Sequence, residues 1–122
     1  MEKKLIRLSK CSLKNSEYAA VIKVLKSDYL GMGPVVKKFE NKLSSYFKRQ
    51  VVCVSTGTSA LHLALQSLNL KHGDQVIIPS LNYVSGFQAV TAARLVPVLC
   101  DVRKIDLSMS IEDLKKKINK KT

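Results

Sequence analysis

Residues 51–68 read VVCVSTGTSALHLALQSL. The first four are apolar and three of them are valines, which predicts a short buried strand over Val51–Val54. The turn Ser55-Thr56-Gly57-Thr58 follows, and the Ala- and Leu-rich segment Ser59–Leu68 then predicts a helix. A strand, a tight turn and a helix in this order are a building unit of α/β domains.

The segments on either side extend this alternation. Upstream, apolar residues at helical spacing predict a helix over 15–27, and Pro34 suits the first turn of a second helix that runs to about Lys48. Alternating strands and helices predict an α/β fold with helices packed on a mostly parallel sheet, and three short strands make that sheet incomplete. The downstream elements are a strand over 75–78, a helix over 84–94, a strand over 96–100 and a helix that begins with Ser110-Ile111-Glu112-Asp113, which resembles a capping box.

Composition is that of an ordinary globular domain, but the charge is strongly basic. The 122 residues include 21 Lys+Arg and 9 Asp+Glu, for a net charge of +12. Such a balance raises the possibility of a small basic module that binds nucleic acid or another polyanion. Against this, the cations are scattered in pairs or lie in the tail 115–121, and no zinc-finger spacing or recognition-helix signature accompanies them. A solvated lysine-rich surface is the favoured interpretation, and the polyanion site remains the alternative.

The cysteines and the N-terminal residues indicate a cytoplasmic protein. Cys11, Cys53 and Cys100 are widely spaced, with no metal-binding or disulfide pattern. Cys53 and Cys100 lie in apolar runs, where a thiol behaves as a small buried apolar group. No apolar signal core or membrane-length run is present in the sequence. We therefore expect a reducing, cytoplasmic setting and no membrane partner.

The turn between the first predicted strand and its helix is the strongest candidate site. Gly57 allows a ligand to approach the backbone closely, and Thr58 and Ser59 add hydroxyl donors at the positive end of a helix. These features suit a phosphate dianion. Serine and threonine also cap helices that bind nothing, so helix capping alone is an equally open interpretation. The turn is not a Walker A motif, because no Gly-Lys-Ser/Thr follows.

Tyr83 is the second candidate residue. It follows the strand over 75–78, and ligands of open α/β sheets gather at the carboxyl ends of strands. Its ring could therefore lie against a planar ligand held by the phosphate turn. The alternative is a tyrosine that simply packs at the start of a helix. Asp101 ends the next strand at the same edge, where capping of a turn is the favoured interpretation.

Five motifs occur in one order along the chain, over about residues 8–114. They are Gly33-Pro34-Val35-Val36 with Phe39-Glu40, Ser55-Thr56-Gly57-Thr58-Ser59 with the helix after it, Gly73–Ser80, Tyr83-Val84, and Val96-Pro97-Val98 with Asp101-Val102. Each motif alone is weak, but five in register are specific. In this order they resemble the N-terminal portion of the fold-type I nucleotide-sugar aminotransferases of the DegT/DnrJ/StrS family.

The resemblance implies a cofactor, a site and an activity. It implies pyridoxal 5'-phosphate bound by Gly57, Thr58 and Ser59, with Tyr83 stacked on the pyridine ring, no metal, and His62 as helical packing. Enzymes of this kind are cytoplasmic homodimers of polysaccharide biosynthesis. They transfer an amino group from an amino acid, commonly glutamate, to a keto-sugar linked to a nucleotide.

The resemblance also implies that parts of the family's machinery are missing. The 122 residues correspond to the N-terminal part of the large domain, with a helix and loop over 1–34 and the start of the α/β sheet region over 35–122. The C-terminal small domain is absent, and no lysine here matches the Schiff-base lysine, so no catalytic residue is assigned. We expect the chain alone to lack transaminase activity. A related sugar dehydratase and a non-functional truncated remnant remain alternatives.

Overall fold

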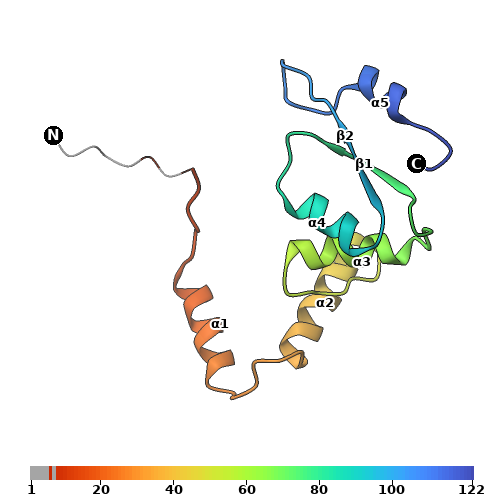
Figure 1. Ribbon diagram of the computed structural model, residues 1–122. Helices are drawn as coiled ribbons and strands as arrows, with labels where there is room; N and C mark the ends of the chain where they lie inside the picture. The colour runs from red at the N-terminus through yellow and green to blue at the C-terminus, as the bar shows by residue number, and fades with distance from the viewer. Residues whose placement is uncertain (1–5, 7) are drawn as a thin grey trace. The chain divides into compact units, whose positions relative to one another are not determined.

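A computed structural model describes Ile6 and residues 8–122, and the chain divides into two compact units, Met1–Val52 and Cys53–Thr122 (Figure 1). None of the helices among the described residues is long and apolar enough to cross a membrane. In chain order the elements are α1 (Asn15–Leu25), α2 (Pro34–Phe47), α3 (Gly57–Ser67), β1 (Gln75–Pro79), α4 (Ser85–Ala92), β2 (Val96–Cys100) and α5 (Ile111–Lys117).

The first unit contains α1 and α2, and both lie within two residues of the predicted bounds. Pro34 occupies the first turn of α2, as expected, and Lys48 ends that helix in a left-handed conformation with φ 53°. The connecting loop is closed by Tyr29, whose hydroxyl donates to the Met32 carbonyl at 3.1 Å. The tyrosine ring lies so close to Gly33 that a Cβ there would collide with it.

The second unit is built on a two-stranded parallel sheet. β1 pairs with β2 in a register from Gln75 opposite Val96 to Pro79 opposite Cys100, and α4 connects the two strands. Helices α3 and α4 pack against each other. The core is a small cluster of Ile78, Val90 and Leu95, with half-buried apolar side chains around it.

Helix α5 is fastened to the end of β2 by polar contacts. Ser110 caps the helix, as predicted, by accepting from the Asp113 N–H at 3.3 Å. The Asp113 carboxylate in turn accepts the Asp101 backbone N–H at 2.7 Å, which lowers the pKa of this carboxyl below its ordinary value. Lys117 Nζ donates to the Leu99 carbonyl at 2.6 Å and lies 3.1 Å from Asp113.

One sequence prediction about this architecture is wrong. Val51–Val54 does not form a strand: within the described residues the parallel sheet consists of β1 and β2, and the Val51 N–H donates instead to the Ser44 hydroxyl at 3.0 Å. Helix α5 ends at Lys117, and beyond it the Lys121 carbonyl accepts the Gln75 N–H at 2.7 Å.

The expected α/β class, with a parallel sheet that is incomplete, is confirmed. Only five apolar residues in the described chain are buried. In the first unit, four large apolar side chains of α1 remain 50% to 59% exposed. Those side chains are Tyr18, Val21, Ile22 and Leu25.

Candidate anion-binding site at the start of helix α3

Thr56 is the residue that organises the start of α3. Its backbone is extended, with φ −146° and ψ 157°, and its Oγ1 accepts the Ser59 N–H at 3.0 Å. Its carbonyl accepts the Ala60 N–H at 3.1 Å, which begins the helical ladder. Sequence reasoning included Thr56 in the turn but not among the site residues. The spacing of a threonine three residues before Ser59, ahead of an Ala- and Leu-rich run, was the available signal for a cap.

Two backbone N–H groups remain at this helix start. Among the described residues, the N–H groups of Gly57 and Thr58 have no hydrogen-bond partner, since the cap satisfies only Ser59. Gly57 is exposed, and a Cβ built on it would meet nothing within 4 Å. A ligand can therefore reach these donors without displacing a side chain.

The electrostatics of the turn favour an anion. The first turn of α3 contains no acidic residue, so the positive end of the helix dipole is not neutralised locally. The Thr58 and Ser59 hydroxyls add two further potential donors beside the two N–H groups, and both residues are half-buried. A donor set of this kind, with no acceptor-only carboxylate in it, matches the oxygens of a phosphate.

Tyr83 lies in the turn that leads into α4 and is 76% exposed. Its position is held by its backbone: its N–H donates to Asn82 Oδ1 at 2.8 Å, and its carbonyl accepts the Gly86 N–H at 3.1 Å. Helices α3 and α4 pack against each other and begin on the same side in Figure 1, so the segments that lead into them lie at the same end of this helix pair. Among the described residues, no hydrogen bond or ring contact involves the tyrosine side chain.

His62 and Asp101 contribute no chemistry that the structure reveals. His62 is half-buried on α3, and its Nε2 is buried without a hydrogen-bond partner among the described residues. The Asp101 carboxylate accepts the Val102 N–H at 2.8 Å, which is the turn capping favoured from the sequence. No group of three His, Cys, Asp or Glu residues within the described ranges could hold a metal ion.

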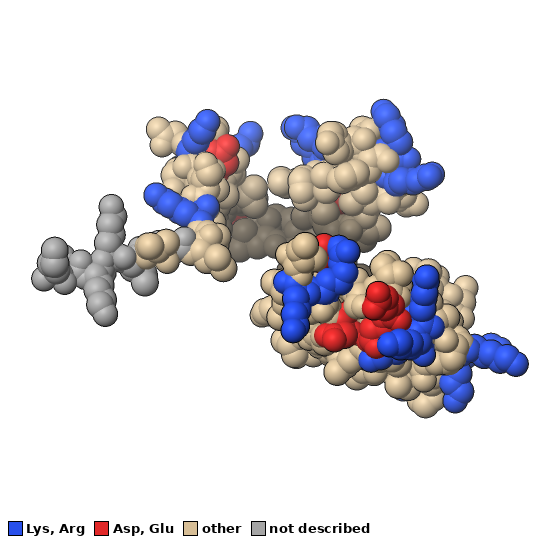
Figure 2. All heavy atoms as spheres, turned by 90° about the horizontal axis from the view of Figure 1, so that it is seen from above, with Lys and Arg blue, Asp and Glu red and all other residues tan. Residues whose placement is uncertain are grey.

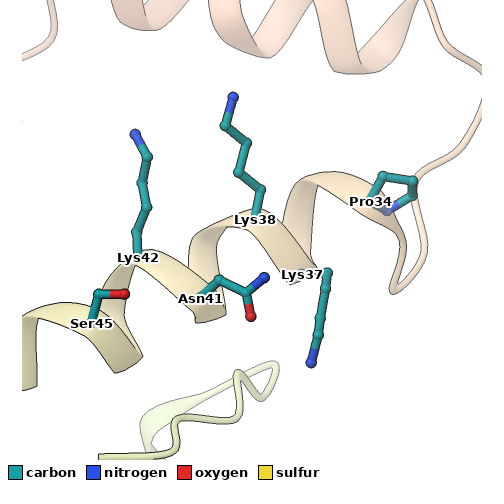
Figure 3. A pocket seen from close by; sticks show the side chains of 6 residues that line it. All are labelled: Pro34, Lys37, Lys38, Asn41, Lys42 and Ser45. Atoms are coloured by element: carbon teal, nitrogen blue, oxygen red, sulfur yellow. The ribbon is translucent and has the colours of Figure 1, made fainter. Parts of the chain in front are cut away.

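In the two views of Figures 2 and 3, the basic side chains do not converge on one site. A hollow of about 680 Å³ follows α2 and is lined by Pro34, Lys37, Lys38, Asn41, Lys42 and Ser45. Figure 3 shows Lys38 and Lys42 pointing to one side of the helix and Lys37 to the other. On the face shown in Figure 2, Lys and Arg side chains are dispersed, and some lie beside acidic ones.

Comparison with known proteins places the chain in a family. Residues 11–122 match the model of the DegT/DnrJ/EryC1/StrS aminotransferase family. GDP-perosamine synthase of Vibrio cholerae is 37% identical over 91 residues, which are 74% of this chain and 25% of that protein. The chain thus spans about a quarter to a third of the length of the relatives it matches.

Solved structures agree on the fold. The aminotransferase TlmJ from Streptoalloteichus hindustanus superposes with a TM-score of 0.82 at 32% identity, over 96% of this chain and 33% of that one. The GDP-4-keto-6-deoxy-D-mannose-3-dehydratase of Escherichia coli, solved with bound hydrated PLP, gives a TM-score of 0.84 at 28% identity. The superposition covers 94% of this chain and 31% of the dehydratase.

Proposed function

The chain belongs to the DegT/DnrJ/EryC1/StrS aminotransferase family, and on this premise we propose that its Gly57–Ser59 turn is the phosphate-binding part of a pyridoxal 5'-phosphate site. One observation carries the proposal: the N–H groups of Gly57 and Thr58 have no hydrogen-bond partner among the described residues, at an exposed helix start that bears no acidic residue. A related structure with bound PLP supports the choice of cofactor.

The residues of this turn fit the phosphate by the chemistry of their donors. Gly57 and Thr58 would bind through their backbone N–H groups, and the Thr58 and Ser59 hydroxyls would complete the set. Tyr83 would place its exposed ring against the pyridine ring, since aromatic rings favour offset stacking. When bound, the cofactor supplies an electron sink for chemistry at the carbon next to nitrogen. The chain's own residues bind and orient it.

The wider activity follows from the family. We propose that the chain represents the N-terminal part of a homodimeric enzyme that transfers an amino group from an amino acid to a nucleotide-linked keto-sugar. The sugar dehydratase is the alternative within the family, supported by the similarity to the Escherichia coli enzyme. The 122 residues alone would not catalyse the transfer, because no lysine in them matches the family's lysine that binds the cofactor covalently. Consumption of glutamate by the purified chain, with a nucleotide keto-sugar present, would refute that statement.

Binding of pyridoxamine 5'-phosphate tests the site itself. This form of the cofactor lacks the aldehyde that would react with surface lysines, and pyridoxamine without phosphate is its matched control. We expect saturable binding of the phosphate form and at least tenfold weaker binding of pyridoxamine, because the proposed contacts are to phosphate oxygens. Equal affinities for the two, or no binding of either at millimolar concentration, would contradict the proposal.

A further inference from the structure

Thr56 makes two contacts to the same residue, and together they go beyond helix capping. Its Oγ1 accepts the Ser59 N–H at 3.0 Å and also lies 2.9 Å from Ser59 Oγ. A hydroxyl has one proton to donate and two lone pairs to accept with. Capping uses one lone pair of Thr56, so its proton remains available for the Ser59 hydroxyl.

The direction of this hydroxyl pair determines what Ser59 can offer to a ligand. If Ser59 donates to Thr56, its only hydroxyl proton is used inside the chain. If Thr56 donates to Ser59, the Ser59 proton can point outward. A phosphate dianion accepts hydrogen bonds and favours the second arrangement, because the Ser59 hydroxyl then donates to it.

We propose that Thr56 is a positioning residue for the phosphate, and the inference rests on the proposed function of the Gly57–Ser59 turn. Thr56 occupies the Ser59 N–H, so that the backbone donors left for the ligand are those of Gly57 and Thr58. It also donates its hydroxyl proton to Ser59 Oγ, which directs the Ser59 hydroxyl to the phosphate. Aligned hydroxyls polarise one another, so the Ser59 hydrogen bond to the phosphate is strengthened by the one behind it.

Three substitutions separate capping from positioning. Thr56→Ser keeps both the acceptor and the hydroxyl proton. Thr56→Asn keeps a side-chain oxygen that caps helices well, but that oxygen carries no proton, and the amide N–H donors are on a different atom from the one that caps. Thr56→Val removes both functions at nearly the same volume. The free energy of unfolding in urea measures the contribution of capping. We expect the Ser and Asn variants to be as stable as the wild type and the Val variant to be less stable.

The test is a titration of the ¹⁵N-labelled 122-residue chain with pyridoxamine 5'-phosphate, followed by the amide signals of Gly57, Thr58 and Ser59. We expect Thr56→Ser to bind like the wild type and Thr56→Asn to bind about 3- to 10-fold more weakly. In a Ser59→Ala background, Thr56→Asn should have no further effect, since its target hydroxyl is gone.

The outcomes distinguish the two proposals. If the wild type shows no saturable shift of the Gly57 amide, the proposed phosphate site is wrong. If the wild type binds and Thr56→Asn binds equally well, the site stands and the positioning role is overturned. An equal loss in the presence and absence of the Ser59 hydroxyl would also overturn it, because a purely structural change at the helix start acts independently of that group.

Discussion

Replacement of Gly57 by proline removes one hydrogen-bond donor from the candidate site without removing the helix. Gly57 is the first residue of α3, a position where proline is favoured because its missing N–H has no helical partner. The preceding residue, Thr56, is extended, as the residue before a proline prefers, and the space where a Cβ would lie is empty to 4 Å. The fold therefore accommodates Gly57→Pro, and Gly57→Ala is the matched control that keeps the N–H.

The expected magnitude follows from the kind of bond that is lost. A hydrogen bond to a charged group contributes about 1.5–3 kcal/mol, so the loss of the Gly57 N–H predicts a roughly 10- to 150-fold weaker affinity for pyridoxamine 5'-phosphate. The free energy of unfolding should stay equal or rise by about 0.4–1 kcal/mol, because proline restricts the unfolded chain. Binding should thus weaken while stability does not fall.

Isothermal titration and urea unfolding on the wild type and both variants measure the two quantities. Gly57→Ala should bind within about threefold of the wild type, since its N–H remains and its methyl group enters open space. Undiminished binding by a folded Gly57→Pro variant would refute the assignment of this N–H to the phosphate. Equal losses in both variants would point instead to a steric effect at this position.

Three further predictions concern the scaffold. The pKa of Asp113 is lowered in the folded chain, first by the Asp101 N–H. The carboxylate therefore stabilises the fold above the ordinary aspartate pKa of about 3.9, and this stabilisation is lost as pH falls through the lower folded value. Asp113→Asn should make the free energy of unfolding in urea less dependent on pH over this acid range, and an unchanged pH profile would contradict the contact. Gly33→Ala should lower the free energy of thermal unfolding by about 0.5–1.5 kcal/mol, because the new methyl group displaces the exposed Tyr29 ring and breaks its hydrogen bond to the Met32 carbonyl. Gly31→Ala, with that ring 3.9 Å from its Cβ, should cost far less. Burial raises the pKa of the Cys100 thiol, so a thiol reagent should label exposed Cys11 in the native chain and reach Cys100 only on unfolding; equal labelling rates would show that β2 is accessible.

Local signals predicted most of the helices and both strands of the sheet. Pro34 marked the start of α2, Ser110 marked the cap of α5, and the β-rich runs after Asp74 and Leu95 became β1 and β2. These elements depend on residues within one or two turns of each other, so the sequence suffices to place them. The family resemblance was likewise carried by short motifs in a fixed order, and the match over residues 11–122 confirms it.

Tertiary structure alone decided the features that depend on distant partners. Val51–Val54 has strand-like composition, but pairing requires a neighbour that the run itself cannot supply. The hydrogen bond from Lys117 Nζ to the Leu99 carbonyl joins residues 18 positions apart, and no local sequence pattern predicts it. At the candidate site, the sequence identified which hydroxyls were present, whereas the geometry determined that Thr56 occupies the Ser59 N–H and leaves those of Gly57 and Thr58 for a ligand. Hydrogen bonds are directional over about 3 Å, so only the folded backbone decides which donors remain.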